Sequence, residues 1–217
     1  MNEDDLVQEA IDLFALANQH CELGALDSAL RLSRRATLIV EQARGAGHPE
    51  LGVALHNHAS LRMACQASPA RTRECLERAL ETFEQAHGLH VEQVAWVLND
   101  LATLELQAGD LPSARDAAAR AVDTAEVVWG LQAPETASSL GLLGTVLFRQ
   151  RRFTAAIRVL ERAIAIREAH DLETEALAVD YEQLGRCLEA RGKTGQAREK
   201  LARAERIAER LAYDLAS

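Results

Sequence analysis

The sequence predicts an all-α solenoid built from five helix-turn-helix repeats, about ten helices in all. Hydrophobic residues make up 48% of the chain and aromatic residues only 4%, and four prolines in 217 residues leave long runs that can form helices. Two motifs also recur with a period of about 42 residues, one in each half of the repeat. A single helix pair has too little core to fold alone, whereas five stacked pairs bury a continuous one.

The motif R-A-x4-E marks the second helix of each repeat. It occurs five times, with 41 to 43 residues between successive alanines. This regularity indicates repeat architecture. We expect the arginine of one repeat to meet the glutamate of the next, and each exposed pair to contribute at most about 1 kcal/mol. The residues are Arg35, Ala36 and Glu41; Arg78, Ala79 and Glu84; Arg120, Ala121 and Glu126; Arg162, Ala163 and Glu168; and Arg203, Ala204 and Glu209.

A small residue marks the first helix of each repeat, with a large apolar residue about four positions before it. The small residue allows two helix backbones to approach closely, and the large residue fills the space beside it on the same face. The small residues are Ala17, Ala59, Ala102, Gly144 and Gly185, and the large ones are Leu13, Leu55, Leu98, Leu140 and Tyr181.

The turns between the helices carry residues suited to helix ends. Pro49 and Pro134 fit the first turn of a helix. Repeat two has Gln66 instead of glycine at its turn and one extra residue, so its turn is the least regular. Three first helices are expected to end at a glycine that adopts the left-handed conformation, namely Gly24, Gly109 and Gly192.

These signals predict one domain over residues 1–217, because no linker or change in composition divides the chain. The expected repeats cover about 3–46, 47–88, 89–130, 131–171 and 172–217. The expected helices cover 3–22, 27–44, 49–66, 70–87, 91–108, 111–129, 134–150, 153–169, 172–191 and 194–215.

Composition limits the partners. The formal net charge of -9 repels phosphate backbones, so we expect no nucleic-acid partner. No apolar run is long enough to span a bilayer, and the acidic N-terminus does not resemble a signal peptide, so we expect no membrane partner and a cytoplasmic location. The four cysteines show neither metal-ligand nor disulfide spacing and are expected to be reduced, mostly buried thiols.

Nothing in the sequence indicates catalysis. It contains no phosphate-binding glycine motif and no arrangement typical of a nucleophile with its base, so we expect neither an enzyme nor a cofactor. His87 and His90 could form a metal pair, but further ligands are not evident, so no metal site is predicted. His58 occupies a repeat position that leucine holds in the other four repeats, and is expected to be packed and hydrogen-bonded.

The repeat unit resembles the tetratricopeptide repeat (TPR). The small residue, the turn Gly-x-[Leu/Phe]-x-x-Ala and the late alanine carry this resemblance over almost the whole chain. The 42-residue period, the connection from Gly45 to Pro49, and the run from Leu98 to Ala102 resemble the kinesin-light-chain-like variety. The resemblance implies a right-handed superhelical solenoid whose first helices line a concave groove that holds a peptide or an extended segment.

Helical phase places a largely polar row on the groove side of the first helices. Small hydroxyl and amide groups there could hydrogen-bond the backbone of a ligand, although any solvent-facing row would also be polar. Trp96 lies on or near this side, where it could anchor a partner or pack against the next repeat. The candidate partner-binding residues are Asn18, His56, Asn57, Ser60, Trp96, Asn99, Asp100, Thr103, Thr145 and Arg186.

We therefore expect a protein–protein interaction module or scaffold that binds a partner protein or peptide in its groove. The alternative is a regulatory sensor whose groove binds a small peptide or effector and switches conformation. The last helix carries an apolar row with no capping helix after it, which predicts a homodimer through the C-terminal helix or cover by a missing neighbour. That row consists of Leu201, Ile207, Leu211 and Leu215.

Overall fold

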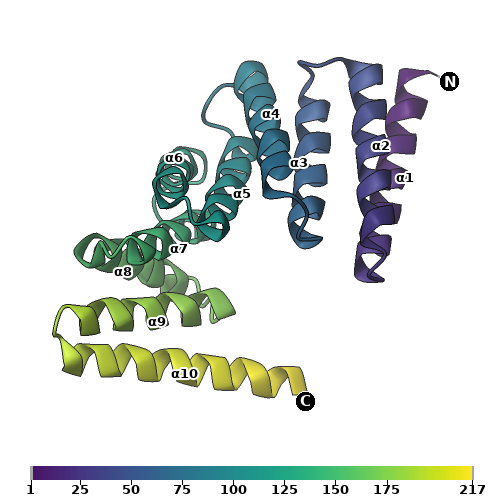
Figure 1. The fold of residues 1–217 in the computed structure, drawn as a ribbon. Coiled ribbons are helices and arrows are strands. Elements are labelled where there is room, and N and C mark those ends of the chain that lie inside the picture. The colour runs from purple at the N-terminus through teal and green to yellow at the C-terminus, as the bar shows by residue number, and fades with distance from the viewer. Residues whose placement is uncertain (1, 217) are drawn as a thin grey trace. The chain divides into compact units, whose positions relative to one another are not determined.

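The computed structural model describes residues 2–216, with side chains described through Tyr213 at the C-terminal end. Within these residues it contains ten α-helices and no strand (Figure 1). The predicted all-α class is therefore confirmed. The helices are α1 (Glu3–Glu22), α2 (Leu26–Arg44), α3 (Pro49–Ala64), α4 (Pro69–His87), α5 (Glu92–Ala108), α6 (Leu111–Val128), α7 (Pro134–Arg149), α8 (Phe153–Ala169), α9 (Glu175–Ala190) and α10 (Thr194–Ala216).

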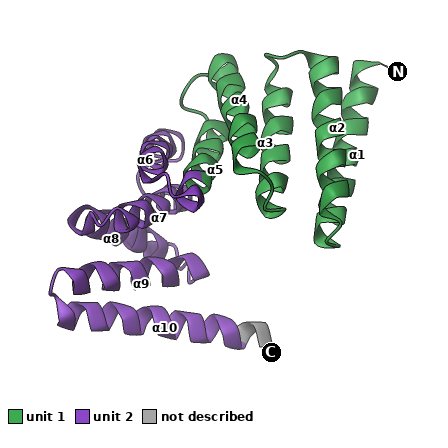
Figure 2. Ribbon diagram, viewed as in Figure 1, with its two compact units in different colours: residues 1–104 green, residues 105–217 purple. Residues whose placement is uncertain are grey.

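The chain forms two compact units, residues 1–104 and residues 105–217, and the boundary falls inside α5 (Figure 2). In unit 1, α1 packs against α2, α2 against α3, and α3 against α4. In unit 2, the same sequential packing runs from α6 to α10. The organisation of residues 1–217 as one domain stays a prediction.

Most helices begin within one residue of the predicted positions. Pro49 and Pro134 occupy the first turn of α3 and α7, as expected. The prediction was wrong for α9, which begins at Glu175 and not at residue 172. The reason is the N-cap: the Oγ1 atom of Thr174 accepts a hydrogen bond from the backbone N–H of Leu177 at 3.4 Å, which fixes the start of the helix.

The turn inside each repeat places one residue in the left-handed region. The three predicted glycines have φ angles of 75°, 82° and 75°. In the other two repeats Gln66 and Arg151 occupy the same repeat position, with φ angles of 50° and 60°. Repeats two and four therefore reach the same turn without glycine, and α3 ends at Ala64, two residues earlier than predicted.

The repeat motifs form the core. All five motif alanines are buried, as are the five small residues of the first helices. The two glycines among them allow close contact between helices: a Cβ at Gly144 would lie 2.5 Å from Cδ2 of Leu160, and one at Gly185 would lie 2.7 Å from Cγ of Leu201. The predicted close approach of the two helices of a repeat is thereby confirmed.

The Gly144 contact gives a first prediction. Gly144→Ala should lower the free energy of unfolding by about 1–3 kcal/mol, because Leu160 is fully buried and must shift to admit the methyl group. Urea denaturation of the purified variant would measure the change. Gly195→Ala in α10 is the matched control, because a Cβ there meets no atom within 4 Å. Equal stability of the wild type and Gly144→Ala would contradict this packing.

The arginines and glutamates of the repeat motif do join neighbouring repeats, but in the opposite direction to the one predicted. Nη2 of Arg78 lies 2.8 Å from Oε1 of Glu41 in the preceding repeat, and Arg162 pairs with Glu126 in the same way. Arg203 pairs with Glu173 in place of the motif glutamate. Each arginine lies six residues before the glutamate of its own helix, and Arg78 and Arg162 pair instead with the glutamate near the end of the preceding second helix.

The last helix exposes less apolar surface than expected. Ile207 is buried in a core formed mainly by α8, α9 and α10, Leu211 packs against that core, and Leu201 is half-buried. The side chain of Leu215 lies outside the described residues. Self-association through this helix stays a prediction. Most of the described apolar side chains in its row pack against other helices of unit 2.

Candidate functional site

The first helices of unit 1 present a set of exposed and half-buried positions, which we call the first-helix face. It comprises Val7, Ile11, Phe14 and Asn18 on α1, Val53, His56, Asn57 and Ser60 on α3, and Trp96, Asn99, Asp100 and Thr103 on α5. In each helix, residues on successive turns are three or four positions apart and so lie on one side, and His56–Asn57 and Asn99–Asp100 are adjacent pairs within one turn. Apolar groups occupy the beginning of each row and polar groups its end.

The apolar part of this face repeats. One repeat position carries a large apolar side chain in four of the five repeats, and all four are exposed, unlike the core positions beside them. The exposed fractions are 55% for Ile11, 45% for Val53, 44% for Trp96 and 38% for Val179. Exposed apolar side chains that recur at one repeat position are typical of a surface that contacts other molecules.

A small pocket of about 250 Å³ lies between α1 and α3 in this face. Its walls are mostly apolar and include Val7, Ile11, Phe14 and Val53, with Asn57 at its edge. Such a cavity has room for one apolar side chain and would remove that side chain from water.

The polar part of the face centres on Asp100. Nε2 of His56 lies 2.8 Å from Oδ2 of Asp100, and the hydroxyl of Ser60 donates to the same oxygen at 3.4 Å. These contacts from α3 orient a carboxylate that is carried by α5. The side chain of Asp100 remains partly exposed, so its second oxygen is positioned as an acceptor.

The other predicted residues of unit 1 differ in exposure. Asn18 and Asn57 are exposed, and Asn99 is half-buried. Thr103 is half-buried and donates its hydroxyl proton to the carbonyl oxygen of Asn99 at 2.9 Å. This hydroxyl can therefore meet a ligand only as an acceptor.

Unit 2 carries the last two predicted residues. Thr145 donates its hydroxyl proton to the carbonyl oxygen of Gly141 at 3.0 Å, and it lines a shallow pocket of about 330 Å³ with Val179. Arg186 is exposed and forms an ion pair with Glu182 on the same helix. The predicted residues of each unit therefore lie on the first helices of the repeats in that unit.

The prediction from sequence missed Val7, Ile11 and Val53. These side chains look like ordinary core residues of an amphipathic helix. The signal that could have found them is their repeat position: Ile11 and Val53 stand where the next repeat has Trp96, the residue that the sequence had already singled out.

His58 is packed as the sequence predicted. It is buried, and its Nδ1 lies 2.7 Å from Oγ of Ser33. Burial is the main cause that lowers its pKa to about 4, and the nearby charges of Arg62 and Arg34 lower it further. His58 is therefore neutral near pH 7.

Three of the four thiols have pKa values above the ordinary value of a cysteine. Burial raises the pKa of Cys65 and of Cys187 to about 11 and also raises that of Cys75. Sγ of Cys65 lies 3.5 Å from Sγ of Cys21. Because the thiolate is the reactive form, these raised pKa values disfavour nucleophilic chemistry at neutral pH.

Two negative findings apply to the part of the chain that the structure describes. No three His, Cys, Asp or Glu side chains among those residues gather as metal ligands would. None of the described helices combines the length and the apolar character that crossing a membrane requires.

Solved structures with the same fold are known. The chain superposes on BtubC of P. vanneervenii with a TM-score of 0.82 and 24% identity, covering 97% of this chain and 89% of that one. It superposes on the TPR-like repeats of a P. anserina protein assigned as a kinesin light chain with a TM-score of 0.78 and 19% identity, covering 93% and 95%. For PlcR of Bacillus thuringiensis, in complex with the peptide PapR7 and DNA, the TM-score is 0.60 with 17% identity, covering 96% and 74%.

At these identities the likeness concerns the fold. No curated protein sequence matches the chain. The family model of the tetratricopeptide repeat matches residues 63–126 and 135–210, more than half of the chain. Together with the five repeats of the sequence and the ten helices of residues 2–216, this match shows that the chain belongs to the tetratricopeptide repeat family and has the fold of the kinesin-light-chain-like solenoids.

Proposed function

We propose that this protein is an interaction module that binds a peptide segment of a partner protein on the first-helix face of unit 1. The segment would carry an apolar side chain next to a basic residue. The observation that carries the proposal is the exposed apolar row of Ile11, Val53 and Trp96 beside the oriented carboxylate of Asp100. TPR repeats in general mediate protein–protein interactions.

The apolar row supplies affinity. The pocket between α1 and α3 is bounded by Ile11, Phe14 and Val53 and has room for one side chain of the partner. Full burial of a leucine-sized side chain contributes about 1.5–3 kcal/mol. Trp96, with 44% of its surface exposed, offers a second apolar contact one repeat away.

Asp100 supplies orientation and charge selection. His56 and Ser60 hold one of its oxygens, which leaves the other to accept from a lysine, an arginine or a backbone amide of the partner. A hydrogen bond to a charged group contributes about 1.5–3 kcal/mol. The net charge of -9 favours the approach of a basic segment and disfavours an acidic one.

The exposed amides of Asn18 and Asn57 flank the apolar pocket and can pair with the backbone of an extended segment. In unit 2, Thr145 and Arg186 stay predicted contacts for the same kind of partner. The PlcR structure, which shares the fold and holds the peptide PapR7, supports a peptide as the class of ligand.

Selection from a random-peptide display library tests the proposal. We expect enriched peptides to share an apolar residue close to a lysine or arginine. In fluorescence anisotropy, Val53→Glu and Asp100→Asn should each weaken binding by about tenfold, the equivalent of about 1.4 kcal/mol. Val53→Glu fills the pocket with a charge, and Asp100→Asn removes the acceptor charge while keeping its shape.

Val127→Glu is the matched control, because Val127 is an exposed valine of α6 outside the first-helix face. It should leave the affinity unchanged. If the selected peptides bound Val53→Glu and Asp100→Asn as tightly as the wild type, the first-helix face of unit 1 would not be the binding surface.

A further inference from the structure

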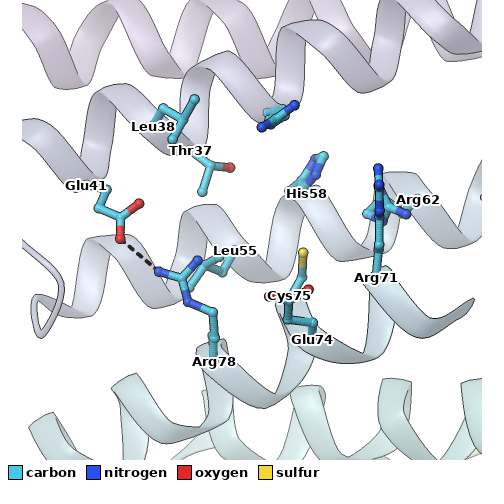
Figure 3. Close-up of a pocket in the computed structure, with 11 residues that line it drawn as sticks. Thr37, Leu38, Glu41, Leu55, His58, Arg62, Arg71, Glu74, Cys75 and Arg78 are labelled. Carbon is cyan, nitrogen blue, oxygen red and sulfur yellow. Dashed lines mark hydrogen bonds and ion pairs between the residues drawn. The ribbon is translucent and has the colours of Figure 1, made fainter. Parts of the chain in front are cut away.

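A second pocket lies in unit 1 on the other side of α3, between α2 and α4. It has a volume of about 380 Å³ and is lined by side chains of all three helices (Figure 3). We call it the arginine pocket, because Arg34, Arg62, Arg71 and Arg78 all line it. In Figure 3, His58, Arg62 and Arg71 lie at one end of the pocket, and Arg78 with its partner Glu41 lies at the other.

Arg62 carries a buried charge that forms no ion pair with the carboxylates of the described residues. Only 8% of its surface is exposed. Its Nε donates to Oγ1 of Thr72 at 3.2 Å, and its Nη2 donates to the carbonyl oxygen of Ser68 at 3.3 Å. Both acceptors are neutral. A buried guanidinium that meets only neutral groups is costly unless an anion compensates it.

Three polar residues near Arg62, including His58, occupy repeat positions that are apolar in the other repeats. His58 stands where the other four repeats have leucine. Thr72 stands where the other four have a buried alanine, and Ser33 stands where they have leucine or alanine. Polar groups have therefore replaced apolar ones around Arg62 and His58, on α2, α3 and α4 of unit 1.

The charges that line the pocket do not cancel. Its four arginines face two glutamates, Glu41 and Glu74, and leave a formal charge of +2 in a protein of net charge -9. Among the described residues Arg78 pairs with Glu41, whereas Arg34 and Arg71 form no ion pair. His58 adds no charge, because burial and the neighbouring arginines keep it neutral near pH 7.

We propose that the arginine pocket binds a phosphoryl group, either as free phosphate or as a phosphate monoester. A phosphate monoester carries about -1.5 to -2 charges at pH 7 and so matches the excess of +2, whereas a single carboxylate does not. The planar guanidinium groups of Arg34 and Arg71 suit the tetrahedral oxygens of a phosphoryl group. The buried charge of Arg62, which also lines the pocket, adds to the attraction for the phosphoryl group. The site lies on different side chains from the peptide surface proposed above and does not depend on it.

Isothermal titration calorimetry with inorganic phosphate on the full chain tests this site. We expect saturable binding below about 10 mM that weakens as salt is added. Arg71→Gln and Arg34→Gln should each weaken it by at least about fivefold, because each removes one unpaired charge from the pocket. Arg31→Gln is the matched control, since Arg31 is an exposed residue of α2 outside the pocket lining, and it should leave binding unchanged.

Two further ligands show whether the phosphoryl group comes from a free ion or a phosphorylated chain, and whether the pocket prefers phosphate to carboxylate. Blocked O-phosphoserine that binds more tightly than phosphate would assign the site to a phosphorylated chain, and phosphate that binds at least as tightly would assign it to the free ion. Succinate should bind more weakly than either. No saturable binding of phosphate, equal binding of succinate, or equal losses in Arg31→Gln and Arg71→Gln would each overturn the proposal.

Discussion

Replacing Asp180 with alanine is expected to lower the free energy of unfolding by about 3–5 kcal/mol. Asp180 of α9 and Arg167 of α8 form a buried ion pair in unit 2, with Nε and Oδ2 3.0 Å apart and both residues less than one-tenth exposed. Removing the carboxylate leaves the guanidinium buried with the carbonyl oxygen of Ala137, 3.4 Å from its Nη2, as a neutral acceptor. Arginine cannot lose its proton to escape that cost.

Removing the arginine instead of the aspartate should lower the free energy of unfolding by less. Arg167→Met leaves Asp180, which can take up a proton, so we expect a loss of only about 1–3 kcal/mol. Desolvation already raises the pKa of Asp180 to about 6, despite the opposing effect of Arg167. The double variant Arg167→Met with Asp180→Leu should be more stable than Asp180→Ala, because apolar side chains can replace a buried pair. Urea denaturation of the three variants measures this order.

The pH response checks the same pair. Because the pKa of Asp180 is higher in the folded chain than its ordinary value of 3.8, the folded state binds the proton more strongly. Its stabilising effect is present at low pH and is lost as the pH rises through 6. The stability difference between wild type and Asp180→Ala should therefore be larger at pH 5 than at pH 7. A difference that shrinks on acidification would contradict this account.

Phe83→Ala is the second large effect, expected to lower the free energy of unfolding by about 3–5 kcal/mol. Phe83 of α4 is 1% exposed, and its ring covers Gly52 of α3 so closely that a Cβ there would lie 2.8 Å from Cε1. Truncation leaves a cavity between the two helices of repeat two. Thermal or urea unfolding would measure the loss, and Leu89→Ala, at an exposed leucine in the connection after α4, should change stability by less than about 0.5 kcal/mol.

A double-mutant cycle tests the contact itself. Gly52→Ala alone should destabilise the protein, because the methyl group meets the ring. In the background of Phe83→Ala the same change should be tolerated, because the ring is absent. Additive effects of the two substitutions would mean that the ring and the glycine do not share this space.

The fold could be predicted from the sequence because its determinants recur. The motif alanines and the small residues of the first helices appear five times each, so the period sets the register and the helix ends follow from glycine and proline. The start of α9 was missed because it depends on Thr174, a cap in a connection that differs from the others. The direction of the arginine–glutamate pairs was missed because a sequence period does not say which side of a helix faces its neighbour.

The buried ion pair of Arg167 and Asp180 could have been found by comparing the repeats. Arg167 stands where repeats one to three have Val40, Phe83 and Ala125, and Asp180 stands where repeats two and three have Ala54 and Val97. Charged residues in two core positions of adjacent helices indicate that they face one another. The pairing of Asp100 with His56 had no such signal, because most of their counterparts lie at exposed or half-buried positions, where polar residues are ordinary.

A peptide segment that binds on the first-helix face of unit 1 should shield the backbone beneath it from solvent. Hydrogen exchange measured with and without a selected peptide tests this binding most directly, because binding slows exchange where the peptide covers the chain. We expect protection in α1, α3 and residues 92–104 of α5, and less protection of the same segments in Asp100→Asn. Protection confined to α2 and α4, with no change in α1 and α3, would contradict binding on this face.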